Sequence, residues 1–153
     1  MLKESLIENN SIKLNQSAAN WEDAIKIGTD ALVASGAIEP RYYDNIIAKI
    51  KELGPYIVLA PGLAMPHSRP EDGVIKTAFG LTTLSEPVDF NGESVSVLVT
   101  LAGNDSNNHI EGIVEITQIF DDPESSDGIN IQKFLDCKTK EEVLAVIDTA
   151  LNA

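Results

Sequence analysis

One stretch near the middle of the chain restricts the backbone more than any other. Residues 56–70 have the sequence YIVLAPGLAMPHSRP, in which a short apolar run precedes a Pro-Gly pair and two further prolines. The apolar run 57–60 is typical of a buried strand, and Pro61-Gly62 predicts a turn after it. Pro66 fixes its own φ and restricts the residue before it to extended geometry. The pattern therefore predicts that His67 is held on a backbone with little conformational freedom.

The two residues after His67 carry complementary chemistry. Ser68 offers a hydroxyl and Arg69 a guanidinium, and the only other histidine of the chain is His109. A neutral imidazole keeps a lone pair on one ring nitrogen and has a pKa of about 6.5, so it suits nucleophilic attack or proton transfer near neutral pH. The sequence therefore indicates a site around His67; a hydrogen-bonded structural histidine is the alternative.

Length and composition restrict the class of protein. The 153 residues fit one domain, covering residues 1–153, with a substantial core. No apolar run is long enough to cross a bilayer, and the first residues lack the apolar region of a secretory signal, so we expect a cytoplasmic protein without membrane insertion. Cys137 is the only cysteine, which excludes an internal disulfide or a thiolate zinc cluster and predicts a partly buried structural residue.

The charge balance points away from nucleic acid. The formal net charge is -13, from 24 acidic and 11 basic residues. Such a surface repels nucleic acid and anionic lipid, and a basic protein partner would suit it better. Acidic residues cluster locally within 121–127, which predicts a solvated loop. A calcium site there is a weaker alternative, because the spacing does not follow an EF-hand loop.

Hydrophobic periodicity predicts helices distributed around a few strands. We expect a helical turn and a short strand within 1–17, and helices over 20–35 (capped by Asn20), 40–53, from about 107, 131–135 and 139–151 (opened by a Thr139/Glu142 capping box). Besides 57–60, strands are predicted over 78–84 and 94–101. Turns are predicted at 85–87 and at Asn91-Gly92. Strands distributed among helices predict a layered α/β domain.

Two details of these elements can be tested directly. The helix over 40–53 is expected to bury one face, formed by Tyr43, Ile46, Ile47, Ile50 and Leu53. The run 94–101 alternates and then becomes continuously apolar, as expected of a central strand covered on both faces.

His109 is predicted to lie in the first turn of the helix that follows this strand. Unpaired backbone N–H groups and the positive end of the helix dipole favour an anion there. If the strand that leads to His67 is a neighbour of strand 94–101, the two histidines can meet at one edge of the sheet. The alternative is that His109 only caps its helix.

The motifs present exclude several kinds of chemistry. The sequence lacks a glycosidase carboxylate pair, a G-x-S-x-G elbow and a phosphate-binding loop. A zinc site would need a third ligand, such as Asp105 or Glu111, and nothing in the spacing demands it. Nucleophilic catalysis by histidine remains, with a helix amino terminus, Ser68 and Arg69 as donors for a phosphoryl group on His67. No cofactor is expected.

The longer segments resemble a known family. GPYIVLAPGLAMPHSRPEDG and AGNDSNNHIEGI are similar to the phosphohistidine region of the enzyme IIA domains of the bacterial phosphoenolpyruvate-dependent sugar phosphotransferase system. Among these domains the segments resemble the mannitol/fructose type, and within that type they are most similar to the ascorbate-specific branch. The resemblance implies a three-layer α/β fold whose mixed sheet of about five strands is flanked by helices.

The resemblance also implies a phosphoryl relay. His67 would take phosphate from the histidine-containing phosphocarrier protein and pass it to a cysteine of enzyme IIB, which serves the membrane component enzyme IIC. His109 matches the second active-site histidine of the family. Where mannitol proteins carry an assisting arginine, this chain has Lys49, which keeps the charge without the bidentate fork; Arg41 or Arg69 are alternatives. Cys137 does not match the enzyme IIB cysteine motif, so the chain is expected to be the IIA component alone.

Two other functions compete with this hypothesis. The same phosphohistidine fold could act as a regulatory sensor of phosphorylation state, or His67, His109 and a carboxylate could form a metal-dependent hydrolase. For partner docking, an apolar collar formed by Leu63 and Met65 is a further hypothesis, but a place in the core is favoured for both side chains.

Overall fold

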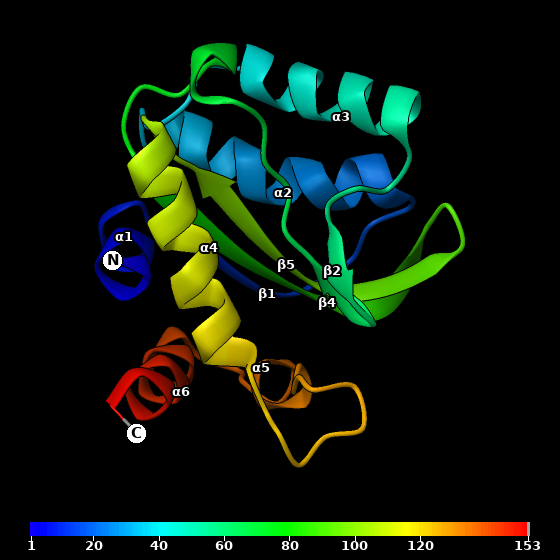
Figure 1. Ribbon diagram of the computed structural model, residues 1–153, viewed down its shortest axis with the longest axis vertical. Helices are drawn as coiled ribbons and strands as arrows, with labels where there is room; N and C mark the ends of the chain where they lie inside the picture. Colours follow the sequence, from blue (N-terminus) through cyan, green and yellow to red (C-terminus); the bar gives the residue numbers. More distant parts are fainter. Residues whose placement is uncertain (153) are drawn as a thin grey trace.

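The computed structural model describes residues 1–152, which form helices packed on both faces of one sheet (Figure 1). The elements are α1 (Leu2–Glu8), β1 (Ile12–Gln16), α2 (Trp21–Ala34), α3 (Arg41–Leu53), β2 (Val58–Ala60), β3 (Gly62–Ala64), a 3₁₀ turn (Pro70–Asp72), β4 (Ala78–Phe90), β5 (Glu93–Ala102), α4 (Ser106–Phe120), α5 (Gln132–Leu135) and α6 (Lys140–Asn152). The helix caps predicted at Asn20 and at Thr139 with Glu142 are confirmed.

The sheet is mixed and has five strands in the order β1-β4-β5-β3-β2. β4 and β5 form an antiparallel hairpin through Asn91-Gly92, where both residues have positive φ, as a tight turn requires. β1 joins β4 in parallel, β3 joins β5 in parallel, and β2 folds back antiparallel to β3. The predicted three-layer α/β class is confirmed, and so is the central position of the strand over 94–101.

Apolar side chains of the sheet supply two separate cores. Along the end of β5, Val97, Val99 and Leu101 pack against α1, α4, α5 and α6, whereas Leu98 and Ala102 face α2 and α3. This alternation follows from the two-residue period of a strand. A strand covered on both faces cannot expose either set, which explains the nearly continuous apolar sequence of β5.

Two local predictions are wrong, and one strand was not predicted. The run 57–60 is not a buried strand, because β2 begins at Val58, forms the edge of the sheet and leaves Leu59 44% exposed; β3, the strand that leads to His67, was not predicted. Residues 85–87 do not form a turn but continue β4 as exposed residues, where its pairing with β5 is irregular. Pro87 has no N–H, and such an irregularity tolerates that loss.

The buried face of α3 also differs from the prediction. Tyr42, Ile46 and Ile50 are buried at i, i+4 and i+8, whereas Tyr43 is half-buried and Leu53 is 67% exposed. Ile46 and Ile50 are buried as predicted, but the centre of the buried face is shifted towards Tyr42. This orientation directs the Tyr42 hydroxyl into the protein.

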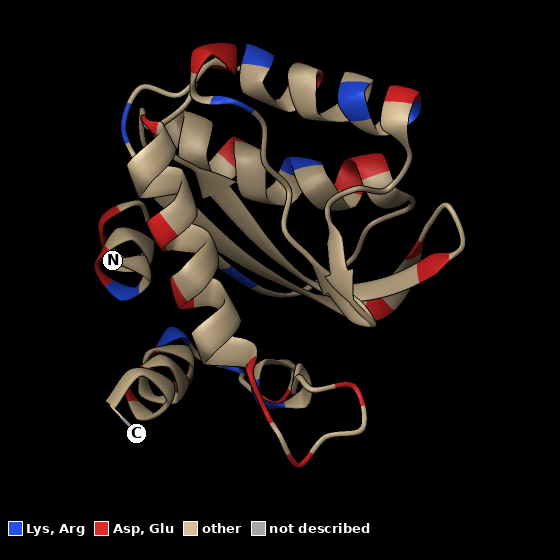
Figure 2. Ribbon diagram, in the orientation of Figure 1, with Lys and Arg blue, Asp and Glu red and all other residues tan. Residues whose placement is uncertain are grey.

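Acidic residues are distributed over most of the visible elements (Figure 2). They include those of the loop after α4, where Asp121, Glu124 and Asp127 are exposed, as the solvated-loop prediction requires. Among residues 1–152 no group of three or more His, Cys, Asp or Glu side chains is placed to hold a metal ion. Cys137 is a buried free thiol.

Candidate functional site

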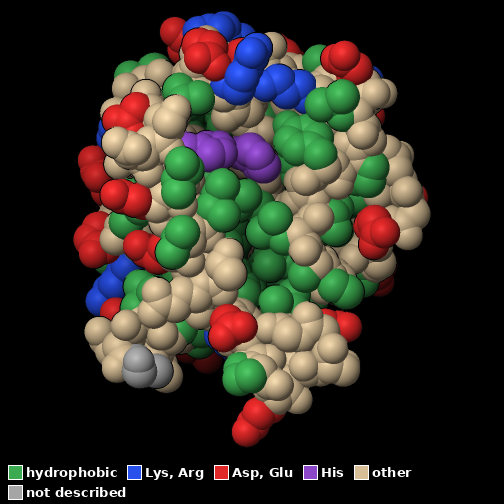
Figure 3. All heavy atoms as spheres, viewed as in Figure 1, with side chains coloured by type: hydrophobic (Ala, Val, Ile, Leu, Met, Phe, Trp, Pro, Cys, Tyr) green, Lys and Arg blue, Asp and Glu red, His purple; other side chains and the backbone are tan. Residues whose placement is uncertain are grey.

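His67 and His109 lie side by side on one face of the molecule (Figure 3). Their ring centroids are 5.2 Å apart and the ring planes cross at 61°. The sheet explains this proximity, because β3 and β5 are parallel neighbours whose carboxyl ends lie at the same edge. The segment with His67 follows β3, and α4, with His109, follows β5. The predicted meeting of the two histidines is therefore confirmed.

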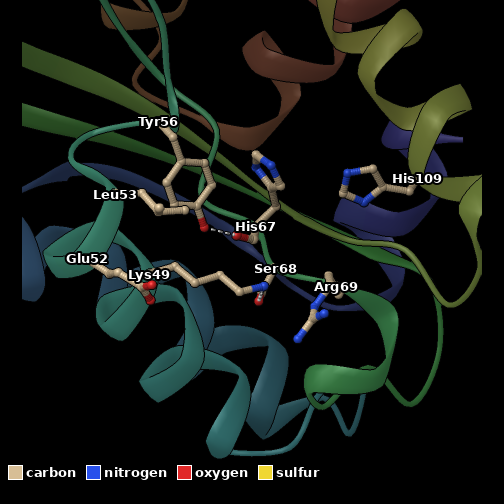
Figure 4. Close-up of a pocket in the computed structure, with 8 residues that line it drawn as sticks. All are labelled: Lys49, Glu52, Leu53, Tyr56, His67, Ser68, Arg69 and His109. Atoms are coloured by element: carbon tan, nitrogen blue, oxygen red, sulfur yellow. Dashed lines mark hydrogen bonds between the residues drawn. The ribbon is translucent and has the colours of Figure 1, made fainter.

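The ring of His67 has one nitrogen engaged and one free. Nδ1 lies 2.6 Å from the carbonyl oxygen of Met65. A carbonyl can only accept, so Nδ1 carries the proton and donates it to this bond, and Nε2 keeps an unshared lone pair. The Tyr56 hydroxyl donates to the carbonyl of His67 at 2.7 Å, and its ring meets the imidazole edge at 5.4 Å between centroids (Figure 4). Both the backbone and the ring of His67 are therefore held.

Tyr42 holds the backbone next to His67 from inside the protein, and it was not predicted from the sequence. Its buried hydroxyl accepts a hydrogen bond from the Ser68 N–H at 2.8 Å and donates to the carbonyl of Leu101 at 2.7 Å. Burial raises the pKa of Tyr42 far above its ordinary value, so the hydroxyl stays neutral and can serve both partners. The Leu101 N–H also donates to the carbonyl of Pro66 at 3.0 Å. These bonds connect the end of β5 with the segment around His67.

Lys49 and Ser68 meet at a buried carboxylate that was also missed. Lys49 Nζ lies 2.8 Å from Ser68 Oγ and 2.9 Å from Asp72 Oδ2, and Ser68 Oγ donates to the same carboxylate oxygen. Burial opposes ionisation of Asp72, but the hydrogen bonds from Ser68 and Lys49 outweigh it and lower its pKa well below the ordinary value. The sequence signal was weak, since only the i, i+4 spacing of Ser68 and Asp72 could have suggested the contact.

The two candidate arginines occupy different places. Arg69 lines the pocket that contains His67, and its Nε lies 3.4 Å from Glu71 and 3.6 Å from Asp72. Arg41 instead pairs with Glu39 at the exposed start of α3 and does not line the pocket. The geometry therefore brings Lys49 and Arg69, but not Arg41, to the site.

His109 is positioned by the start of α4. Asp105, not His109, is the N-cap, because its side chain accepts from the Asn108 N–H at 2.8 Å; the capping alternative for His109 is wrong. The His109 N–H is already bonded to the Asp105 carbonyl, so the first free N–H groups of the helix precede it. A Cβ on Gly103 would lie 2.9 Å from His109 Cα, which shows how closely the helix packs on the strand end. Nδ1 of His109 is buried without a hydrogen-bond partner.

A pocket of about 530 Å³ unites these groups. Its lining residues are Lys49, Glu52, Leu53, Tyr56, His67, Ser68, Arg69 and His109. Burial lowers the pKa of His67 despite the bond to Met65, and the neighbouring His109 and Lys49 lower it further. Burial alone lowers the pKa of His109. Both imidazoles are therefore neutral at pH 7, which leaves His67 Nε2 available for nucleophilic attack.

Comparisons with known proteins agree with this geometry. The family model "Phosphoenolpyruvate-dependent sugar phosphotransferase system, EIIA 2" matches residues 5–150. The chain belongs to this family. An ascorbate-specific PTS system EIIA component of Shigella boydii is 50% identical over 151 residues, 96% of this chain and 95% of that protein.

Solved structures extend the comparison of this EIIA 2 chain. The crystal structure of PtxA from Streptococcus mutans, described as a PTS IIA, has a TM-score of 0.92 and 42% identity, with 99% of this chain and 96% of that chain covered. An Escherichia coli complex of the mannitol enzyme IIA with phosphorylated enzyme IIB contains a chain with a TM-score of 0.76 and 26% identity, with coverage of 91% and 94%.

The surface of the EIIA 2 chain around the histidines is partly apolar (Figure 3). Leu53, Ile110 and Val114 are all more than half exposed. Leu63 and Met65 form no collar, because both side chains are 2% exposed and belong to the core, which was the favoured alternative for both. No helix within residues 1–152 is both long and apolar enough to span a membrane.

Proposed function

We propose that this chain carries a phosphoryl group on His67 Nε2, which it receives from the histidine-containing phosphocarrier protein and passes to a cysteine of enzyme IIB. The observation that carries the proposal is the unshared lone pair of Nε2 on a ring that lines the pocket, with a second imidazole 5.2 Å away. Family membership agrees with this role.

In the first transfer, Nε2 attacks the phosphorus of the donor's phosphohistidine. The new N–P bond forms as the donor's N–P bond breaks, and the electron pair of the broken bond returns to the donor imidazole. The attack leaves positive charge on the His67 ring. The Met65 carbonyl stabilises this charge, because it accepts the Nδ1–H bond. In the second transfer, a cysteine thiolate of enzyme IIB attacks phosphorus, and the electron pair returns to Nε2.

The surrounding donors fit a group that carries negative charge. His109 is placed to donate a hydrogen bond to a phosphoryl oxygen or to orient His67, while Lys49 and Arg69 supply positive charge at the pocket. Ser68 contributes through its contact with Lys49. Phosphoryl transfer depends mainly on such positioning and charge stabilisation, so no metal or cofactor is required of this chain.

The pathway assignment follows the named relatives. Because relatives at about half identity over almost the whole chain are ascorbate-specific EIIA components, we infer that the carrier serves uptake of ascorbate or a related substrate. The substrate itself would be bound by the membrane component, enzyme IIC. We place this carrier in the cytoplasm as a single domain over residues 1–153.

Intact mass spectrometry tests the proposal. The chain is incubated with phosphoenolpyruvate, enzyme I and the phosphocarrier protein, as wild type, His67→Ala and His109→Ala. We expect one acid-labile phosphoryl group on the wild type, none on His67→Ala, and transfer slowed by about 10²-fold or more in His109→Ala, as for a lost transition-state donor. Added enzyme IIB should drain the phosphate rapidly, whereas a regulatory sensor would retain it. A folded wild type that stays unphosphorylated would contradict the proposal.

A further inference from the structure

The Asp72 carboxylate gathers three groups at the edge of the His67 pocket. A single oxygen, Oδ2, accepts from Ser68 Oγ, from Lys49 Nζ at 2.9 Å and from the Arg69 N–H at 3.2 Å. Asp72 does not line the pocket itself. It lies in the 3₁₀ turn directly after the His67 segment, and its side chain is 13% exposed. The carboxylate therefore acts on the pocket only through the residues that it holds.

Lys49 is the most important of these residues electrostatically. Its ammonium has three N–H donors, of which Asp72 and Ser68 occupy two, so one remains for a group in the pocket. Its side chain is 26% exposed, and an ion pair at this depth is screened less than a surface pair. The Arg69 side chain is 68% exposed, and its contacts with Glu71 and Asp72 contribute little.

The pairing reduces the attraction of the pocket for an anion. An unpaired ammonium would attract a phosphoryl group by its full charge, whereas the charge of Lys49 is partly compensated by the Asp72 carboxylate, 2.9 Å from its Nζ. A carrier must release its phosphoryl group as readily as it accepts it, so a pocket of reduced anion affinity suits transient carriage.

We propose that Asp72 is a positioning residue that fixes Lys49 and Ser68 beside His67 and, by neutralising Lys49, limits how strongly the pocket retains a phosphoryl group. The inference rests on the proposed function and assigns to it a residue that makes no contact with the pocket. It requires that the effect of Asp72 on phosphoryl retention depend on Lys49.

The test measures how phosphoryl groups distribute at equilibrium between this protein and the phosphocarrier protein. The phosphorylated form of the phosphocarrier protein, freed of enzyme I, is mixed with wild type, Asp72→Asn, Lys49→Met or the double variant of this protein. Intact masses then give the phosphorylated fraction of each of the two proteins. Asp30→Asn is the matched control, because it removes the same charge and releases Lys26 from an exposed pair on α2. Circular dichroism confirms folding of each variant.

We expect Asp72→Asn to shift the equilibrium towards phosphorylated His67 by about fivefold, because Lys49 is released for the phosphoryl group. Lys49→Met should shift it the other way by a similar factor, the double variant should match Lys49→Met, and Asp30→Asn should match wild type. A merely structural role for Asp72 would lower stability without raising the phosphorylated fraction.

Two results would overturn the inference. One is an unchanged or lower phosphorylated fraction in folded Asp72→Asn. The other is a phosphorylated fraction of the double variant that still differs from that of Lys49→Met. If Asp72→Asn fails to fold, Lys49→Met alone decides, since an unchanged equilibrium there removes the role of the ammonium. A folded wild type that accepts no phosphoryl group would instead overturn the proposed function, and with it the inference.

Discussion

The Tyr42 hydroxyl links the segment that carries His67 to the strand that leads to His109. It occupies the Ser68 N–H and the Leu101 carbonyl, two buried backbone groups that have opposite hydrogen-bonding needs. A phenylalanine would fill the same space and satisfy neither. This oxygen, which hydrogen-bonds to neither ring, therefore helps to fix the separation of the two imidazoles, together with the bond from the Leu101 N–H to the Pro66 carbonyl.

Tyr42→Phe should destabilise the protein by about 2 kcal/mol, because it leaves a buried donor and a buried acceptor without this partner. It should also slow phosphoryl acceptance about tenfold at a temperature where the variant is fully folded, since the reacting groups lose alignment. Urea unfolding and rapid-quench transfer kinetics measure the two effects. Tyr43→Phe is the control, because its half-buried hydroxyl donates one bond of 3.2 Å to the Glu22 carbonyl. Equal effects of both variants would contradict the linking role.

Residue-level chemistry was the most predictable part of the site. His67, followed by Ser68 and Arg69 between two prolines, could be selected from sequence, and the structure places all three at the pocket. Tyr42 and Asp72 could not, because their importance comes from backbone groups and side chains brought near by folding. A hydroxyl bonded to a residue 59 positions away leaves no local pattern.

At the scale of elements, long periodic segments were predictable and short ones were not. α2, α6 and β5 carry enough apolar repeats to reveal their type. β3 has three residues, and its pairing with β5 comes from a distant part of the chain, so no periodicity could identify it. The proline-containing segment 85–87 has turn composition, but the residues on both sides of it pair with β5, and β4 continues through it.

The first turn of α4 packs so closely on the end of β5 that only glycine fits at position 103. A Cβ on Gly103 would lie 2.9 Å from both the N and Cα atoms of His109, and backbone atoms cannot rotate away as side chains can. Gly103→Ala should therefore displace the first turn of α4, with a cost of about 2 kcal/mol, and should slow phosphoryl transfer to His67. Thermal denaturation and transfer kinetics measure both.

Gly80→Ala provides the matched control for Gly103→Ala. It adds the same methyl group to the adjacent strand, where the nearest atom would lie at 3.5 Å, an ordinary contact distance. We expect near wild-type stability and transfer. If Gly103→Ala behaves like Gly80→Ala, the close packing of α4 on the strand end does not position His109.

At the scale of the whole molecule, acidification has two opposing effects on stability. The net charge of -13 decreases in magnitude as carboxylates gain protons, which relieves repulsion in the folded state. The site acts in the opposite direction. The pKa values of His67 and His109 are lowered in the folded protein, so the unfolded chain binds protons first as pH falls through about 6.5. The contribution of the two histidines to stability must then decrease with falling pH in this range.

Asp72 adds a second window at lower pH. Its folded-state pKa is depressed, so its contribution is present above the unfolded value of about 3.9 and is lost as pH falls below it towards the folded value. We expect the free energy of unfolding, from urea titrations, to fall first between about pH 7 and 5 and again below about pH 4. A His67→Gln/His109→Gln double variant should lose the first decrease and keep the second, and Asp72→Asn should reduce only the second. An unchanged slope between pH 7 and 5 in the double-histidine variant would show that relief of global repulsion, and not the buried imidazoles, governs stability in this range.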